Sequence, residues 1–260
     1  KRLILIQNDA AGTGKSTLTQ SLARYLRHHG AGHQIISLVS EDDALGDHPV
    51  LEADSLTGAL FFEQIDQSPI TLLEIETGLG DFFANFYQRN ELETVLAEAG
   101  IQISVVVPVT GEPDTFESVI RAAEVYSDSA EYTIAHLVTG SYDDDDRAWD
   151  RSYAARVMDM FEAVELYLPE IGFQLEMELR AHHIELPQAL AEPDAAELFG
   201  RDFVQWLGRS NGQIDGARQY LFGDSFVPTT GRPQASNGAR DGARQAMEME
   251  CSGAVAGRRC

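Results

Sequence analysis

The chain has 260 residues, of which 42 are acidic and 19 basic, and its formal net charge is −23. This length predicts one to two domains with a full hydrophobic core, and so acidic a surface repels phosphate backbones, which excludes direct non-specific DNA binding by the body of the protein. Both cysteines, Cys251 and Cys260, lie in the last ten residues, so no disulfide framework is expected and the composition is typical of a cytoplasmic protein.

Short apolar runs alternate with helical patterns along the chain. Strands are expected over residues 3–6, 34–39, 70–75, 103–109 and 132–138, and helices between Leu18 and Gly30 and over 92–99, 115–126, 148–168 and 195–207. No apolar run is long enough for a membrane span, and the first is too short for a signal peptide. Strands that alternate with helices predict an α/β fold in three layers, with a mainly parallel central sheet flanked by helices.

The character of the sequence changes near residue 225. Residues 225–260 are rich in Gly, Ala, Arg, Ser and Pro and lack apolar periodicity, which predicts a disordered tail. The tail has five arginines against three acidic residues, a net charge of +2, which leaves −25 on residues 1–224. Residues 1–224 are therefore expected to form the folded domain.

The strongest functional signal is the segment from Asp9 to Thr17, between a buried strand and an amphipathic helix. It contains Gly12-Thr13-Gly14-Lys15-Ser16-Thr17 and matches the end of the pattern G-x-x-x-x-G-K-[ST], with Asp9 in place of the first glycine. We expect the backbone from Ala11 to Thr17 to surround a phosphate group, with Lys15 on the β- and γ-phosphates and the Ser16 hydroxyl on Mg²⁺. Lys15 is one of only two lysines among the 19 basic residues. The segment predicts the fold of P-loop nucleoside triphosphatases, with ATP and Mg²⁺ as cofactors.

Carboxylates follow two of the expected strands. Glu41-Asp42-Asp43 comes after the second strand, and Glu76-Thr77-Gly78 comes after the strand over 70–75. Because parallel strands deliver their carboxyl ends to one edge of the sheet, both groups are expected beside the phosphate segment. There they would hold magnesium and orient water.

The order of these motifs resembles the ParA/MinD family of deviant-Walker ATPases, and within it the plasmid stability and conjugative-transfer branch of StbB- and TraL-like proteins. The resemblance implies Lys15, Asp42 and Glu76 as catalytic residues, with Ser16, Asp42 and Glu76 on the metal side. It also implies a nucleotide-dependent homodimer that acts on protein partners in plasmid partition, stability or conjugative transfer. In this family a signature lysine reaches across the dimer to the nucleotide of the other subunit, and the position of that lysine is Ala10 in this chain. Hydrolysis is therefore predicted to be weak.

Several alternatives stay open at this level. The aromatic group from Phe82 to Tyr87 follows the second acidic motif, and it fits either core packing or a contact with a partner or second subunit. The same phosphate segment occurs in small-molecule kinases, for which Arg147, Arg151 and Arg156 would be a phosphate lid. A ligase of the dethiobiotin-synthetase type and a nucleotide-binding module without hydrolysis are further readings. Thr139-Gly140 leaves the choice between ATP and GTP undecided.

Overall fold

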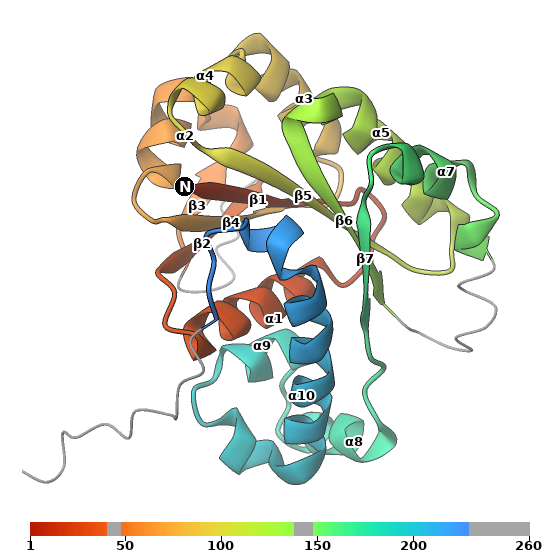
Figure 1. Cartoon of the computed structure of the whole chain (residues 1–260). Coiled ribbons are helices and arrows are strands. Elements are labelled where there is room, and N and C mark those ends of the chain that lie inside the picture. The colour runs from red at the N-terminus through yellow and green to blue at the C-terminus, as the bar shows by residue number, and fades with distance from the viewer. Residues whose placement is uncertain (41–47, 138–147, 229–260) are drawn as a thin grey trace, which may run out of the picture. The chain divides into compact units, whose positions relative to one another are not determined.

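The computed structural model describes residues 1–40, 48–137 and 148–228 (Figure 1). Asp42, the Thr139-Gly140 pair and Arg147 lie outside the described residues, as does the chain from residue 229 onward. The predicted boundary at residue 224 and the predicted disorder of 225–260 therefore stay predictions.

The middle layer of the fold is a parallel sheet. In the described part of the chain it has seven strands in the order β3-β2-β4-β1-β5-β6-β7, and every pairing between them is parallel. The strands are β1 (Arg2–Ile6), β2 (His33–Val39), β3 (Val50–Glu52), β4 (Ile70–Ile75), β5 (Gln102–Val109), β6 (Ala130–Leu137) and β7 (Val164–Leu168). The predicted α/β fold with a parallel sheet is confirmed. Since all strands point the same way, the segments that follow β1, β2 and β4 meet at one edge.

Helices cover both faces of this sheet (Figure 1). One face carries α1 (Lys15–His28) and α10 (Ala195–Phe222), and the other carries α2 (Gly58–Ile65), α3 (Gly80–Arg89), α4 (Leu92–Glu98), α5 (Glu117–Tyr126) and α7 (Tyr153–Met160). Two further helices, α8 (Phe173–Ala181) and α9 (Leu186–Ala191), share a small core of their own with the first half of α10. The described ranges also contain the 3₁₀ turns η1 (Ala53–Ser55), η2 (Pro113–Phe116) and η3 (Ser127–Ser129). None of the helices in the described ranges combines the length and the apolar character needed to cross a membrane.

The continuous apolar run of β1 is explained by its central position. Successive side chains of a strand point to opposite faces. Leu3 and Leu5 accordingly enter the core beneath α2–α5 and α7, while Ile4 and Ile6 enter the core beneath α1 and α10. All four are at most 1% exposed. A strand buried on both faces has no solvent-facing side, so residues 3–6 of β1 are all apolar.

The predicted helix over 148–168 is wrong in its second half. The helix α7 ends at Met160, and Val164–Leu168 forms β7, which extends the sheet beside β6. Glu162 between them has a left-handed φ of 53°, which helices of L-residues do not continue through. Pairing with β6 buries Leu166 and Leu168, and this long-range contact decides against the local helical pattern.

The helix predicted over 195–207 is present but longer. It belongs to α10, which continues to Phe222 and includes one residue, Gly200, with non-helical backbone angles. The second half of α10 packs on the sheet through Ile214 and Leu221, so its length is set by the sheet that it covers.

Candidate functional site

The phosphate loop (residues 9–17) leads from β1 into α1, as predicted. Gly12 and Gly14 have left-handed φ angles of 73° and 74°, which L-residues with a side chain rarely adopt. At Gly14 a Cβ atom would also lie 1.9 Å from Cδ2 of Leu137, whereas at Gly12 it would meet nothing within 4 Å. Both glycines are therefore required by the backbone, and Gly14 additionally by its contact with the end of β6.

Lys15 is the first residue of α1 and is only 9% exposed. Its Nζ donates to the backbone oxygen of Asn8 at 2.6 Å and to Oγ1 of Thr77 at 2.8 Å. Burial lowers the pKa of Lys15, while the carboxylates of Glu74, Asp9 and Glu76 act in the opposite direction. The predicted phosphate lysine therefore lies between the phosphate loop and the segment after β4, which we call the switch loop (residues 76–80).

The carboxylate that contacts Ser16 belongs to a residue that the sequence analysis did not single out. Ser16 Oγ donates to Oε1 of Glu74 at 2.6 Å. Oε2 of Glu76 instead accepts a hydrogen bond from the backbone N–H of Ser40 at 2.6 Å. Glu74 lies within β4, beside Ile6 of β1 and Ser37 of β2, and it was missed. A charged residue inside an otherwise apolar strand was the signal that could have identified it.

Residues 12–17 and Glu76, all predicted as phosphate or metal residues, line one groove of about 1120 Å³. Its lining includes Gly12 to Thr17 together with Glu74, Glu76 and Thr77, and it extends over β2 toward α9. Ala11 is exposed in the loop. The volume slightly exceeds the roughly 300–1,000 Å³ of ordinary ligand pockets, so the groove has room for a nucleotide.

Oxygen donors in this groove fit Mg²⁺. The Ser16 hydroxyl and the carboxylates of Glu74 and Glu76 are hard oxygen ligands, the type that Mg²⁺ prefers. Within the described ranges, no three His, Cys, Asp or Glu side chains are grouped closely enough to hold a metal by themselves. Magnesium at a phosphate site is commonly held by one or two protein ligands together with phosphate oxygens and water. Asp42, the third predicted metal residue, lies outside the described residues.

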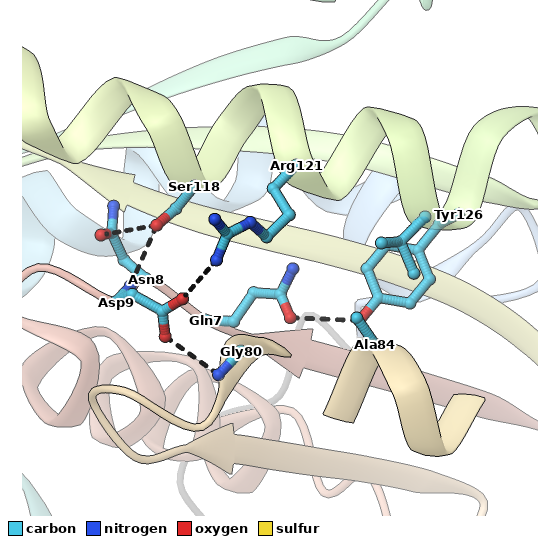
Figure 2. Close-up of a pocket in the computed structure, with 9 residues that line it drawn as sticks. Gln7, Asn8, Asp9, Gly80, Ala84, Ser118, Arg121 and Tyr126 are labelled. Carbon is cyan, nitrogen blue, oxygen red and sulfur yellow. Dashed lines mark hydrogen bonds and ion pairs between the residues drawn. The ribbon is translucent and has the colours of Figure 1, made fainter. Parts of the chain in front are cut away.

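Asp9 replaces the first glycine of the motif and makes contacts that the sequence did not predict. Its Oδ1 accepts hydrogen bonds from the backbone N–H groups of Gly78 at 3.2 Å and Gly80 at 2.9 Å. Its Oδ2 lies 3.3 Å from Nη1 of Arg121 on α5, and Figure 2 shows these groups converging. The neighbouring Ala10 offers no charge. Asp9 therefore joins the phosphate loop to the switch loop.

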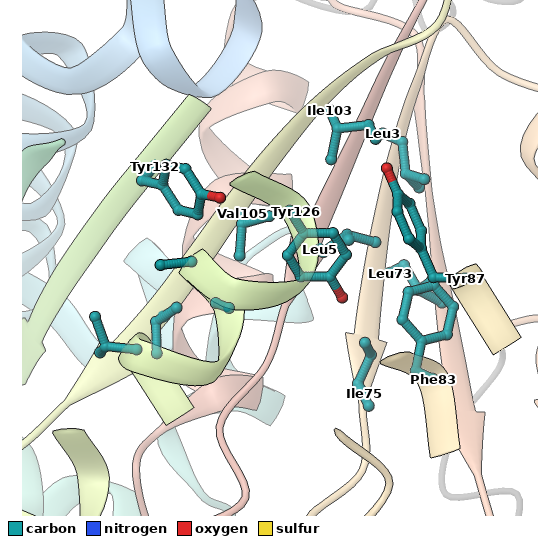
Figure 3. Packing of buried hydrophobic residues seen from close by; sticks show 14 of the residues in the cluster. Leu3, Leu5, Leu73, Ile75, Phe83, Tyr87, Ile103, Val105, Tyr126 and Tyr132 are labelled. Atoms are coloured by element: carbon teal, nitrogen blue, oxygen red, sulfur yellow. The ribbon is translucent and has the colours of Figure 1, made fainter. Parts of the chain in front are cut away.

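The aromatic group from Phe82 to Tyr87 packs in the core, which is the first of the two readings that the sequence left open. Phe83, Phe86 and Tyr87 are at most 7% exposed, and Phe82 packs against the same core half-buried. In Figure 3, Phe83 and Tyr87 lie against Leu73 and neighbouring strand residues. On a helix these positions share one face, and that face of α3 covers the sheet.

The arginines predicted as a kinase lid do not line the groove where the structure describes them. Arg156 lies on α7, with its guanidinium 5.9 Å from the ring centre of Tyr153. The helix α7 covers the sheet face opposite to α1, and Arg151 precedes it. Neither is among the residues that surround the groove.

Comparison with known proteins gives only distant likenesses. No protein-family model matches the chain, and no curated protein matches it. MinD cell division protein of Aquifex aeolicus has 14% identity and a TM-score of 0.47, covering 87% of this chain and 99% of that chain. The MinC:MinD complex of the same organism has 14% identity and a TM-score of 0.42, covering 83% and 96%. FlhF complexed with GMPPNP/Mg²⁺ has 14% identity and a TM-score of 0.37, covering 65% and 66%. At such values, function has to be inferred from the residues of the site.

Proposed function

We propose that this protein is a nucleotide-dependent switch that binds ATP with Mg²⁺ on its phosphate loop and hydrolyses it slowly. The observation that carries the proposal is the position of the Lys15 ammonium between Asn8, which directly precedes the phosphate loop, and Thr77 of the switch loop. A phosphate that accepts a hydrogen bond from the Lys15 ammonium competes with Oγ1 of Thr77 for that ammonium. One side chain thus couples ligand binding to the switch loop, and a ligand shifts a conformational equilibrium through such differential contacts.

Ser16 and Glu74 are the proposed magnesium-side residues. They lie in hydrogen-bond contact at 2.6 Å, so a metal ion bound to the Ser16 oxygen has a carboxylate next to it. Bound Mg²⁺ would neutralise charge on the β- and γ-phosphate oxygens. Glu76 lines the same groove and is proposed to act from the switch loop, with Asp42 as the residue that orients water.

Slow hydrolysis is proposed because Ala10 brings no cation to the phosphates. In phosphoryl transfer, a cation supplied by an arginine finger accelerates the reaction by about 10³–10⁵. Lys15 is buried within the site, and Asp9 beside Ala10 carries the opposite charge. A turnover well below the roughly 1–100 s⁻¹ of kinases is therefore expected.

We further propose that the switch acts in plasmid partition, stability or conjugative transfer through protein partners and a nucleotide-dependent homodimer. The support is the order of sequence motifs shared with the ParA/MinD family, together with a net charge of −23, which disfavours direct contact with nucleic acid. Sedimentation velocity with Mg²⁺ and a non-hydrolysable ATP analogue tests the dimer. A protein that stays monomeric when saturated with the analogue would contradict it.

Calorimetry tests the nucleotide site itself. Wild-type protein should bind ATP in the presence of Mg²⁺, and Lys15→Ala should lose most of this affinity. The matched control is Lys1→Ala, which removes the other lysine of the chain, an exposed residue paired with Asp66. Equal affinities for wild type and Lys15→Ala would remove the phosphate-site proposal.

One observation favours a second candidate, a P-loop small-molecule kinase or a dethiobiotin-synthetase-like ligase. The groove continues from the phosphate loop over Ser37 and Val39 of β2 toward Gln188 of α9, which leaves space for an acceptor beside the phosphates. A metabolite screen that monitors ADP release separates the two candidates. A fast, acceptor-dependent release of ADP would favour the kinase or ligase, whereas nucleotide binding without any turnover would indicate a non-hydrolysing module.

A further inference from the structure

The Asp9 carboxylate lies at a place where a phosphate-loop pattern has a glycine without a side chain. It accepts two backbone hydrogen bonds from the switch loop, at 3.2 Å from Gly78 and 2.9 Å from Gly80. Gly80 is also the first residue of α3, where unpaired N–H groups and the helix dipole favour an anion. The Asp9 carboxylate is thus the hydrogen-bond acceptor for the N–H groups of the switch loop that face the phosphate loop.

Arg121 keeps this carboxylate in place from the other side. Its Nη1 lies 3.3 Å from Oδ2 of Asp9 and 2.8 Å from Oδ1 of Asp81 at the start of α3. The same helix, α5, is fixed to the phosphate loop by Ser118, whose Oγ accepts from the N–H of Asp9 at 3.0 Å and donates to Oδ1 of Asn8 at 3.1 Å. Figure 2 shows Asp9 between Gly80 and Arg121. The switch loop, the start of α3 and α5 therefore converge on the Asp9 side chain.

The switch loop is attached to the phosphate loop at two points. Lys15 holds Thr77 through its ammonium, and Asp9 holds Gly78 and Gly80 through its carboxylate. Because Lys15 and Asp9 contact neighbouring residues of the switch loop, and Asp9 opposes the lowering of the Lys15 pKa by burial, a terminal phosphate on that ammonium would lie within the field of a like charge. Like charges at short range in a partly buried site repel strongly. Binding of a nucleotide with a terminal phosphate and the contacts of Asp9 with Gly78 and Gly80 therefore oppose each other.

We propose that Asp9, Arg121 and Asp81 form a latch on the N–H groups of Gly78 and Gly80, and that a nucleotide with a terminal phosphate must displace the Asp9 carboxylate from the switch loop. This inference rests on the proposed nucleotide switch and names how that switch is restrained. ADP, which lacks the terminal phosphate, binds without opening the Asp9 latch. As long as the latch is closed, the protein therefore disfavours the triphosphate relative to ADP.

The first test needs no nucleotide. Hydrogen–deuterium exchange of the peptide covering residues 76–82 should be faster than in wild type in Asp9→Ala, which removes the acceptor of the hydrogen bonds from Gly78 and Gly80, and in Arg121→Gln, which removes the cation that holds this acceptor. Loss of a hydrogen bond to a charged group corresponds to about a 10-fold change in the local opening equilibrium. Glu124→Gln is the matched control, since it removes one exposed negative charge from α5. Exchange unchanged in both latch variants would refute the latch, whether or not nucleotide binds.

The second test compares two nucleotides by calorimetry with Mg²⁺. In Asp9→Asn the affinity for AMP-PNP should rise about 10-fold relative to that for ADP, and the ratio should stay at its wild-type value in Glu124→Gln. A ratio unchanged in Asp9→Asn would overturn the competition between carboxylate and phosphate. Wild-type protein that binds neither nucleotide would instead overturn the proposed function, and the exchange experiment would still decide on the latch contacts. Melting temperatures of the variants identify any that fail to fold.

Discussion

Replacing Glu74 by glutamine should weaken magnesium-dependent nucleotide binding, and replacing Glu76 by glutamine should weaken it far less. Oε1 of Glu74 lies 2.6 Å from Ser16 Oγ, the distance of a charge-assisted O–H···O⁻ bond. Hydrogen bonds to charged groups contribute about 1.5–3 kcal/mol, which corresponds to about 10- to 100-fold in affinity. Glu76 accepts from the backbone N–H of Ser40 and not from Ser16, so the loss of its charge weakens no contact of the proposed metal ligand Ser16.

Calorimetry with ADP, in the presence of Mg²⁺ and of a chelator, isolates the metal-dependent part of the affinity. Glu74→Gln should reduce this part by the factor above, while Glu76→Gln should retain most of it. The opposite ranking would refute our assignment and restore Glu76, the carboxylate that sequence reasoning selected.

The same substitution has a consequence for pH dependence. Burial lowers the pKa of Lys15 from 10.5, and among the groups that raise it Glu74 acts most strongly. Removing that charge lowers the pKa of Lys15 further. Because a neutral amine no longer attracts phosphate, nucleotide affinity in Glu74→Gln should fall at a lower pH than in wild type as the pH is raised. A titration in which both proteins lose affinity at the same pH would contradict the coupling.

Three further predictions concern stability. Gly14→Ala should be destabilised by left-handed backbone strain of about 1–2 kcal/mol and by overlap with Leu137, whereas Gly12→Ala should show the strain alone, as measured by calorimetric melting. Arg2→Met should lower the denaturant midpoint, because Ser104 Oγ and the carbonyl oxygen of Leu221 lose the hydrogen bond from the guanidinium, and each buried oxygen left without it costs about 1–3 kcal/mol. A midpoint equal to that of wild type would show that these bonds contribute nothing. Glu165 has hydrogen bonds with His136, Trp149 and Tyr167, and these lower its pKa from 4.5 to about 2 against the opposing effect of burial. The folded state therefore gains stability above pH 4.5 that is lost as the pH falls toward 2. Across that window the stability of Glu165→Gln should depend less steeply on pH than that of wild type.

Sequence alone predicted the features whose causes are local. The run from β1 through Gly12 and Gly14 into α1 is encoded by an apolar strand, two residues free to adopt positive φ, and an amphipathic helix. Each of these is visible within about 20 residues. The strand positions of β2, β4, β5 and β6 were likewise predicted, because strands buried on both faces leave continuous apolar runs. The short strand β3 and the helices α2, α8 and α9 carry weaker patterns and were not predicted.

Tertiary structure decided which side chains reach the phosphate loop. Glu74 lies in β4 and Glu76 directly after it, and no local pattern says which of them contacts Ser16. The register of β4 against β1 makes it Glu74. The same holds for Asp9, whose partners in the switch loop lie about 70 residues away. It also holds for β7, which became a strand because β6 offered an edge to pair with. A local pattern specifies the conformation of a segment, whereas strand order and register specify its neighbours, and the chemistry of this site depends on the neighbours.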